Sequence, residues 1–417
     1  MIGYHTGRGR GASKTPRPAI LQVWEDSLPT GEDGQRPLFN TASDEEIRSA
    51  RVADVYFYRT MQVLRARGLK DTPAHAEVSF KTSDPDAWYV LAGLDEVAKL
   101  LADLPGVEVN AVPEGTICRP YEPVLTLSGS YSAFAEHETA ILGFLCQASG
   151  IATGAARCKL AAGDRPVTSF GARRMHPSIT PMIERAAYLG GCDGVAVELA
   201  ADRMGIPATG TVPHALALVL GSTAEAARAF DETIDSSVPR TILIDTYDDE
   251  KFGAIIAAEA IPDTITAVRL DTPGNRRGDF RDLMAEVRWE LDRHGYGHVK
   301  IFASGGIGVD DILHLNPVCD AYGVGGAIAA APMIDFSLDI VEVNGEDRSK
   351  RGKRGGRKRL VKLPDNSRRT LPANAAAPGE ATDLLRPLSE LYPDGDPPVS
   401  EPRERVLSQL SSGDYGL

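Results

Sequence analysis

The hydrophobic pattern becomes a regular alternation between about residues 166 and 343. Short apolar runs rich in β-branched residues precede longer segments of helical periodicity, and the runs are VTSFG, GVAVE, TILID, AVRLD, KIFASG and DAYGVG. A repeated strand-then-helix pattern is typical of a parallel β-sheet covered by helices. Because no GxGxxG motif follows the first strand, the pattern favours an α/β barrel over a doubly wound sheet.

The regions on either side of this alternation follow other patterns. Residues 48–165 mix helical and strand-like runs, including a strand at 124–129 and a helical stretch at 132–160, and predict an α+β domain. Residues 1–47 are rich in Gly, Pro, Arg and Asp without any period, and predict an irregular arm. Residues 371–417 hold seven prolines, which predicts a mobile acidic tail with one short helix.

The composition is that of a soluble, folded chain. Its 417 residues are 42% hydrophobic and 25% charged, which excludes disorder over most of the length. No apolar run approaches the roughly 18 to 20 residues of a membrane span, and no hydrophobic stretch follows the basic start, so we expect a cytoplasmic protein without a membrane segment. The five cysteines are widely spaced without a CxxC pair, which argues against a disulfide framework and a zinc ribbon.

The net charge of −13 is unevenly distributed. Residues 348–369 contain eleven Lys or Arg and one acid, a local +10, so the remainder carries −23. An acidic body disfavours broad contact with a phosphate backbone, and nucleic acid is therefore not an expected partner. The basic segment, residues 344–370, is expected to close the fold or to flank an active site.

Charged residues follow the predicted strands, where the chemistry of α/β barrels is located. They are Arg173, Arg174, His176, Glu198, Asp245, Asp248, Asp249, Arg269 and Asp271. The arginines can clamp phosphate or carboxylate groups through forked hydrogen bonds, and the aspartates can hold hydroxyl groups or Mg²⁺. The alternative interpretation is a set of ordinary surface ion pairs at the bases of loops.

Two glycine-rich turns follow the last two predicted strands. The first contains Ser304, Gly305 and Gly306, and the second contains Gly323, Gly325 and Gly326. Exposed backbone N–H groups in such turns can bind a phosphate, and two consecutive turns of this kind predict a phosphate site. Either turn taken alone would equally well serve only to reverse the chain.

Two further residues have ambiguous patterns. His214 begins an apolar helix, where a histidine can accept a phosphoryl group or transfer a proton, although it more often caps or packs. Tyr56 lies on the apolar side of a helical segment. It can stack on an aromatic ligand or belong to the core, and the pattern alone favours the core.

Together these motifs resemble the nicotinate phosphoribosyltransferases, especially the archaeal-type branch. The resemblance runs from about Ala53 to Arg359 and is carried, in order, by ADVYFYRT, PYEPVLTLSGSY, HETAILGFLCQASGIATGAAR, SFGARRMHP, GTVPH, LIDTYD, VRLDTPGN, FASGGI, YGVGGA and KRGKRGGRK. It implies an irregular α/β barrel of the type II phosphoribosyltransferase kind with an N-terminal α+β domain. It also implies a homodimer or higher homo-oligomer with active sites near the subunit interface.

The resemblance further implies a reaction in NAD salvage. Nicotinate and phosphoribosyl pyrophosphate would give nicotinate mononucleotide and pyrophosphate, with Mg²⁺ as cofactor and with coupled hydrolysis of ATP. A pyridine nitrogen attacking an anomeric carbon needs positioning and charge neutralisation rather than a proton acceptor. This requirement agrees with the absence of an obvious pair of acid and base residues in the motifs.

Individual roles also follow from the resemblance. Tyr56 would stack on the pyridine ring, and Arg269 would hold its carboxylate. His214 matches the histidine that ATP phosphorylates in the family, which reverses the interpretation drawn from its pattern alone. The remaining assignments are the anion site to Arg173, Arg174 and His176, the ribose and Mg²⁺ side to Asp245 and Asp271, and the 5′-phosphate to Ser304, Gly305, Gly306, Gly323, Gly325 and Gly326. Glu198 is expected to be catalytic from its place after a predicted strand.

Two departures from the family pattern qualify these expectations. Ala215 follows His214 where some relatives have serine, so tight coupling to ATP is less strongly expected. No cysteine follows Cys319, so the C-terminal zinc domain of some relatives is not expected. The alternatives left open are a quinolinate phosphoribosyltransferase, which would work without ATP, and a non-catalytic scaffold that binds phosphate or nucleotides.

Overall fold

A computed structural model describes residues 39–417 apart from positions 85, 103, 394, 396 and 414. Most of the arm predicted at residues 1–47 therefore lies outside the described residues. The chain divides after Val52 into two units. In the first unit, the short helix α2 (Asp44–Arg48) begins with a capping box in which the side chains of Ser43 and Glu46 accept each other's backbone N–H.

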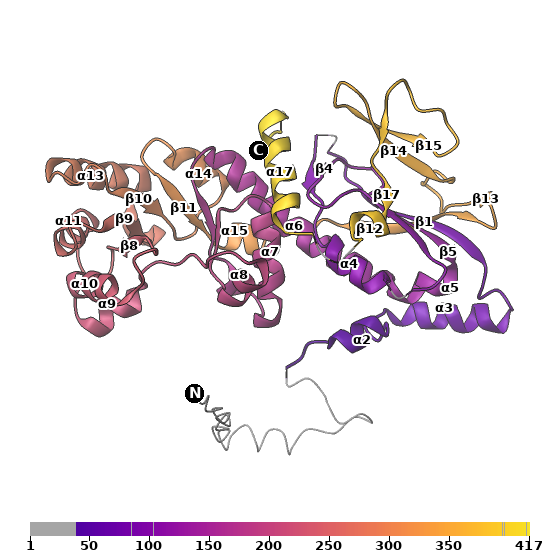
Figure 1. The fold of residues 1–417 in the computed structure, drawn as a ribbon, viewed down its shortest axis with the longest axis horizontal. Helices are drawn as coiled ribbons and strands as arrows, with labels where there is room; N and C mark the ends of the chain where they lie inside the picture. Colours follow the sequence, from indigo (N-terminus) through magenta and orange to yellow (C-terminus); the bar gives the residue numbers. More distant parts are fainter. Residues whose placement is uncertain (1–38, 85, 103, 394, 396, 414) are drawn as a thin grey trace, which may run out of the picture. The chain divides into compact units, whose positions relative to one another are not determined.

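The second unit, Ala53–Leu417, contains the N-terminal α+β domain (Figure 1). Its antiparallel sheet has the order β13-β12-β1-β5-β3-β17, and the strands are β1 (Pro73–Phe80), β3 (Glu108–Ala111), β5 (Leu125–Ser130), β12 (Phe336–Val343), β13 (Glu346–Asp347) and β17 (Arg386–Pro387). The same domain contains a two-stranded sheet of β2 (Tyr89–Val90) and β4 (Ile117–Cys118). Its helices are α3 (Val55–Ala66), α4 (Leu94–Leu101) and α5 (Tyr131–Phe134).

Strand β12 corrects the predicted domain boundary at residue 343. Phe336 pairs with Phe80 and Leu338 with Val78, so β12 belongs to the N-terminal sheet and not to the barrel. Its apolar and polar residues largely alternate along FSLDIVEV, and this pattern suits either location. The pairing joins residues more than 250 positions apart in sequence, and no local pattern contains that information.

The parallel sheet forms a half-barrel, which agrees with the predicted irregular α/β barrel. Its order is β7-β6-β11-β10-β9-β8, and the strands are β6 (Val167–Ser169), β7 (Gly194–Val195), β8 (Arg240–Leu243), β9 (Ile265–Leu270), β10 (Lys300–Ala303) and β11 (Ala321–Val324). All five strand pairs are parallel. The order follows the sequence around the sheet and leaves β7 and β8 as its two edges.

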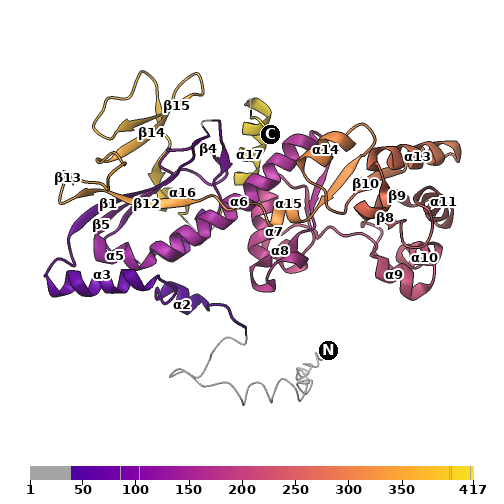
Figure 2. The same ribbon diagram turned by 180° about the vertical axis from the view of Figure 1, so that it is seen from behind.

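Helices connect these strands (Figure 2). They are α7 (Thr180–Leu189), α8 (Glu198–Met204), α9 (His214–Leu220), α10 (Thr223–Thr233), α11 (Glu250–Ala260), α12 (Gly274–Arg277), α13 (Phe280–Arg293), α14 (Val309–Leu315) and α15 (Gly326–Ala329), with 3₁₀ turns η2 (Ala172–Arg174) and η3 (Pro177–Ile179) after β6. The apolar residues of the strands and helices form one continuous core. This arrangement directs the carboxyl ends of all six strands to one edge of the sheet.

Residues 209–212 form an irregular segment that fills the seam, the gap between the edge strands β7 and β8. The backbone N–H of Thr209 donates to the carbonyl of Val195 on β7 at 2.7 Å, and that of Val212 donates to the carbonyl of Thr241 on β8 at 3.4 Å. A Cβ atom at Gly194 would lie 2.5 Å from the Thr209 hydroxyl, so glycine permits this close approach. The segment leads directly into α9, whose first residue is His214.

The long helix α6 (Glu138–Ala162) joins the two domains, with the 3₁₀ turn η1 (Ala135–His137) before it. The helical run Tyr131–Ala162 is long and apolar enough to cross a membrane, but 61% of its apolar window is buried inside the protein. The hydroxyls of Thr153 and Ser149 accept the backbone N–H groups of Val90 and Ala92. These contacts are those of a central core helix.

The C-terminal region is more structured than its composition predicts. A three-stranded sheet contains β14 (Lys358–Lys362), β15 (Arg368–Pro372) and β16 (Thr382–Asp383), and two helices follow, α16 (Leu388–Leu391) and α17 (Ser400–Ser412). Val406 on α17 is fully buried. The side chain of Arg403 bonds the carbonyl of Cys192, and the amide of Gln409 bonds that of Gly115. The predicted mobile tail is therefore wrong for this part, because averaging over its prolines conceals a helix with a buried face.

Candidate active site

Four residues predicted from the sequence meet at the carboxyl end of the half-barrel. Asp245 follows β8, Asp271 follows β9, Ser304 follows β10, and His214 begins α9. The Nε2 atom of His214 lies 3.9 Å from Asp245 Oδ1 and 3.9 Å from Asp271 Oδ2. Ser304 Oγ donates a hydrogen bond to Asp271 Oδ1 at 2.9 Å. The groups that the sequence predicts at the strand ends thus meet in the structure, although they lie up to 90 residues apart in the sequence.

The two aspartates differ in their surroundings. The Asp245 side chain is only 2% exposed, and its Oδ1 atom has no hydrogen-bond partner, whereas the Asp271 side chain is 34% exposed. Burial raises the pKa of Asp245, against the opposing effect of His214. A buried, unpartnered carboxylate oxygen beside a second carboxylate fits a divalent cation such as Mg²⁺.

The rest of a cation's coordination shell would have to come from elsewhere. Within the described residues, no group of three or more His, Cys, Asp or Glu side chains is arranged to hold a metal ion. Mg²⁺ usually needs only one or two protein carboxylates, because waters and substrate phosphates provide its other ligands. Asp245 and Asp271 therefore suit a Mg²⁺ ion that binds together with a phosphorylated substrate.

Arg269 lies on β9 beside these carboxylates. Its guanidinium is 5.8 Å from the centre of the Phe170 ring, and its Nη1 donates to the hydroxyl of Thr211. The Nε atom is buried without a hydrogen-bond partner. Burial lowers the pKa of Arg269, although guanidinium groups remain charged in proteins. A fixed, partly unsatisfied cation of this kind can bind a carboxylate.

The first glycine-rich turn has the backbone that the sequence predicts. Gly305 and Gly306 have φ angles of +89° and +74°, a left-handed conformation that favours glycine. A Cβ atom at Gly305 would lie 2.9 Å from Asp271 Oδ1. The turn therefore lies directly against Asp271, on the same side of the sheet as the carboxylate pair.

The second turn divides into two parts. Gly323 lies inside β11, where a Cβ atom would be 2.4 Å from the Phe170 ring, which stacks on Phe302. The Phe170 ring thus fills the space beside Gly323, and the role of this glycine is to allow that packing. Gly325 and Gly326 lie at the strand end, where they begin α15. Of the three glycines in this turn, these two are the ones that follow the strand, where the sequence predicts the phosphate site.

The residues after β6 and β7 are only loosely connected to the cluster. Arg173 is exposed, yet close enough to Arg269 to influence its pKa. Arg174 is also exposed. His176 accepts the backbone N–H of Ser178 and so caps η3. Glu198 is exposed at the start of α8, and within the described part of the chain no hydrogen bond or ion pair joins it to the aspartates.

Tyr56 lies on α3 in the α+β domain. It is 54% exposed, which corrects the interpretation as a core residue that its pattern favours. Its ring lies 4.2 Å from that of Phe57, and its surroundings include Glu138 and Asp54. None of these neighbours belongs to the half-barrel. Tyr56 is therefore available on the surface and does not contact the Asp245 cluster of its own chain.

Two threonines of the site were not predicted from the sequence. Thr211 accepts a hydrogen bond from Arg269, and Thr246 Oγ1 lies 2.9 Å from Nδ1 of His214. Thr211 belongs to the motif GTVPH, which also contains His214, and Thr246 belongs to the motif LIDTYD, which also contains Asp245. Threonine is common at strand ends, so only the distances distinguish these two from others.

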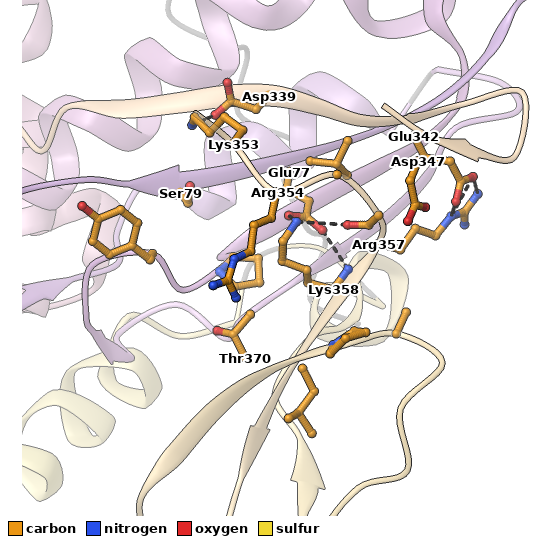
Figure 3. A pocket seen from close by; sticks show the side chains of 18 of the residues that line it. Glu77, Ser79, Asp339, Glu342, Asp347, Lys353, Arg354, Arg357, Lys358 and Thr370 are labelled. Carbon is orange, nitrogen blue, oxygen red and sulfur yellow. Dashed lines mark hydrogen bonds and ion pairs between the residues drawn. The ribbon is translucent and has the colours of Figure 1, made fainter. Parts of the chain in front are cut away.

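A cavity of about 780 Å³ lies in the α+β domain (Figure 3), and no residue of the half-barrel strands lines it. Its walls come from β1, β12, residues 352–358 and residues 370–374. Two of the acids in it are paired with neighbouring cations: Glu77 with Lys358 at 2.7 Å, and Glu342 with Arg357 through a forked contact. Arg354 extends into the cavity.

The basic segment is held in the same region by Asp339. This buried carboxylate is contacted by Lys81, Lys350 and Lys353. The neighbouring lysines lower the pKa of Asp339 and outweigh the opposing effect of burial. Much of the positive charge near residues 348–369 therefore neutralises carboxylates of the α+β domain, which explains how a strongly basic run fits into an acidic protein.

Comparisons with protein families place the two domains. Residues 54–149 match the model described as "Quinolinate phosphoribosyl transferase, N-terminal domain", and residues 151–339 match the corresponding C-terminal domain. The two matches meet within α6. The C-terminal match begins in that helix and includes the whole half-barrel with the clustered residues.

Individual relatives give the same result. The chain is 32% identical over 325 residues to the nicotinate phosphoribosyltransferase pncB2 of Mycobacterium tuberculosis, an alignment that covers 73% of this chain and 68% of the relative. It is also 32% identical to pncB1 of the same organism, and there it covers 65% of the relative's length.

Solved structures extend the similarity. The structure titled nicotinate-nucleotide pyrophosphorylase from Pyrococcus furiosus is 46% identical, with a TM-score of 0.87 over 90% of this chain and 98% of that one. Human nicotinic acid phosphoribosyltransferase is 21% identical, with a TM-score of 0.64 over 86% of this chain and 93% of that one, and shares the fold.

Proposed function

Because the chain belongs to the nicotinate and quinolinate phosphoribosyltransferase family, we propose that it transfers the phosphoribosyl group of phosphoribosyl pyrophosphate to nicotinate in NAD salvage. The products are nicotinate mononucleotide and pyrophosphate. The observation that carries this proposal is the combination of one buried, partly unsatisfied arginine, Arg269, with the carboxylates Asp245 and Asp271 at one strand edge.

The site residues suit a substitution at the anomeric carbon. The lone pair of the pyridine nitrogen forms the new C–N bond while the C–O bond to pyrophosphate breaks, and the ring nitrogen becomes a cation without losing a proton. Arg269 holds the nicotinate carboxylate and so orients the nitrogen, since its free Nε edge can make a forked contact. The turn at Ser304–Gly306 and Gly325–Gly326 supplies backbone N–H groups toward the 5′-phosphate.

Asp245 and Asp271 would hold Mg²⁺ in this proposal. The unpartnered Oδ1 atom of Asp245 and the partly exposed Asp271 supply oxygen ligands of the type that Mg²⁺ prefers. A Mg²⁺ ion held by these two carboxylates would supply positive charge against the pyrophosphate leaving group. The exposed Arg173 and Arg174 add positive charge on the solvent side of this region.

ATP coupling through His214 is part of the proposal. The ring is 40% exposed at the mouth of the half-barrel, so a nucleotide can reach it. A ring nitrogen would attack the γ-phosphorus of ATP, ADP would leave as its P–O bond breaks, and water would later hydrolyse the phosphohistidine. The added charge beside Asp245 and Asp271 would change the affinity for substrates and products.

A second copy of the chain would complete the site. Tyr56 stacks on the pyridine ring in this proposal, yet it lies exposed on α3 without contact to the half-barrel of its own chain. We therefore propose a homodimer, or a higher homo-oligomer built from such dimers, in which Tyr56 reaches the half-barrel of a partner. The proposed location is the cytoplasm.

A quinolinate phosphoribosyltransferase is the second candidate, because both matching family models carry that description. Quinolinate has a second carboxylate and loses CO₂, so it needs additional cations and no ATP. A pyrophosphate-release assay with nicotinate, nicotinamide and quinolinate, each with and without ATP and Mg²⁺, separates the candidates. Turnover of nicotinate with ATP stimulation supports the first proposal. Turnover of quinolinate alone, without ATP, would replace it with the second.

A further inference from the structure

We infer that Glu184, on α7, is a positioning residue that fixes the Phe170 ring beside the guanidinium of Arg269. This inference rests on the proposed role of Arg269 in holding the nicotinate carboxylate. The Glu184 side chain is fully buried on a face of α7 whose other buried residues are apolar. Its two oxygens contact two different strand ends of the half-barrel, the edge at which the proposed site lies.

The carboxyl group of Glu184 bridges β6 and β7 where their pairing ends. The last paired residues of the two strands are Ser169 and Val195. Oε1 of Glu184 accepts the hydroxyl of Ser169 at 3.2 Å, and Oε2 accepts the backbone N–H of Ala196 at 3.1 Å. A side chain from the helix that connects the two strands therefore continues their cross-link beyond the last pair.

Stability does not account for an acid at this place. Among the described residues, no lysine or arginine forms an ion pair with Glu184, and burial raises its pKa to about 7 against the opposing effect of its two hydrogen bonds. A buried carboxyl group without a counter-charge costs free energy relative to an apolar side chain of similar size. The two hydrogen bonds, and the strand ends that they hold, are what an apolar residue could not provide.

The bridge reaches the proposed site through Phe170, which directly follows Ser169. The backbone N–H of Phe170 donates to a carbonyl of β11 at 2.8 Å. Its ring stacks on Phe302, and the ring centre lies 5.8 Å from the guanidinium of Arg269. Phe170 is thus held on one side by β11, and Glu184 secures the other side through Ser169.

Loss of the bridge should therefore weaken the binding of nicotinate. Without Glu184, the buried hydroxyl of Ser169 lacks its partner, and the strand end must shift to find another. The Phe170 ring moves with that strand end, and the guanidinium beside it loses part of its support. Because Arg269 holds the carboxylate both before and during the proposed reaction, the loss should raise KM for nicotinate more than it lowers kcat.

Fluorine nuclear magnetic resonance of the full chain labelled with 4-fluorophenylalanine tests the bridge without any substrate. The Phe170 signal is assigned by its absence in F170L. We expect it to move in E184M, whose side chain accepts no hydrogen bond, and in S169A. E184Q should keep the wild-type signal, because an amide can accept the N–H of Ala196 and donate to the hydroxyl of Ser169. An unmoved signal in either E184M or S169A, or a moved one in E184Q, would overturn the inference.

Steady-state kinetics test the consequence. E184M should raise KM for nicotinate about two- to tenfold, the range for one lost hydrogen bond, with a smaller change in kcat, and E184Q should restore it. L291A is the matched control, since the buried Leu291 in the last turn of α13 affects stability without contacting the bridge. An equal rise of KM in L291A would refute the positioning role. If the wild type does not turn over nicotinate, the proposed function fails, while the fluorine spectra still decide whether Glu184 positions Phe170.

Discussion

Replacing Arg269 with lysine should damage nicotinate binding much more than folding. The guanidinium is fixed between the Phe170 ring and the Thr211 hydroxyl, and its buried Nε atom has no partner in the protein. A lysine ammonium presents a single charged point and cannot reproduce a forked contact. One lost charge-assisted hydrogen bond costs about 1.5–3 kcal/mol, which corresponds to about a 10- to 150-fold higher KM for nicotinate.

The loss should also grow with pH. Burial lowers the pKa of Arg269, and a lysine in the same place would experience the same desolvation from a lower starting value. The variant would therefore lose charge, and with it affinity for a carboxylate, as the pH rises, whereas the wild-type guanidinium remains charged.

Initial rates across a range of nicotinate concentrations measure this effect, and urea unfolding measures stability. We expect the free energy of unfolding of R269K to change by less than about 1.5 kcal/mol, because one hydrogen bond to a neutral hydroxyl is at stake. R293K, at an exposed arginine on α13, is the matched control and should leave KM unchanged. An unchanged KM in R269K would remove Arg269 from the nicotinate site.

Three other outcomes are expected. H214A should abolish ATP stimulation of pyrophosphate release while preserving the fold, and full stimulation in this variant would exclude the phosphohistidine. Burial raises the pKa of Glu184 to about 7. Above the ordinary pKa of glutamate, the folded state therefore binds more protons than the unfolded state does. The free energy of unfolding should accordingly fall from about pH 4.5 to about pH 7, and urea unfolding of E184Q should show a smaller fall, because Glu96 and Glu138, whose pKa values burial also raises to about 7, remain. L410A on α17 should cost about 2 kcal/mol or more against almost nothing for the exposed S408A, and equal stability in the two variants would mean that α17 does not pack as described.

The candidate site could be predicted because its residues follow short-range rules. Asp245, Asp271 and Ser304 each follow an apolar strand directly, and parallel strands must end at a common edge. The same rule selected Arg269 and the turn at Gly305. Resemblance to a family added what the pattern could not, namely the proposal that ATP phosphorylates His214, a residue that the pattern alone assigned to capping or packing.

Other features depend on contacts between distant parts of the chain. Gly323 has the sequence context of a phosphate turn, but the Phe170 ring occupies the space beside it. Strand β12 continues the alternating pattern, yet it pairs with β1 in the other domain. Tyr56 has the spacing of a core residue and is exposed. In each case the local pattern permits two outcomes, and the identity of the packing partner decides between them.

The sequence by itself determined the parallel sheet covered by helices, the strand ends where charged groups collect and the concentration of positive charge near residue 350, because these depend on periodicity and on neighbours along the chain. Only the tertiary structure decided that residues 209–212 fill the seam, that the basic segment neutralises Asp339, and that Thr246 contacts His214. These outcomes depend on distances of a few ångströms between segments far apart in sequence, and no local pattern of residues encodes such distances.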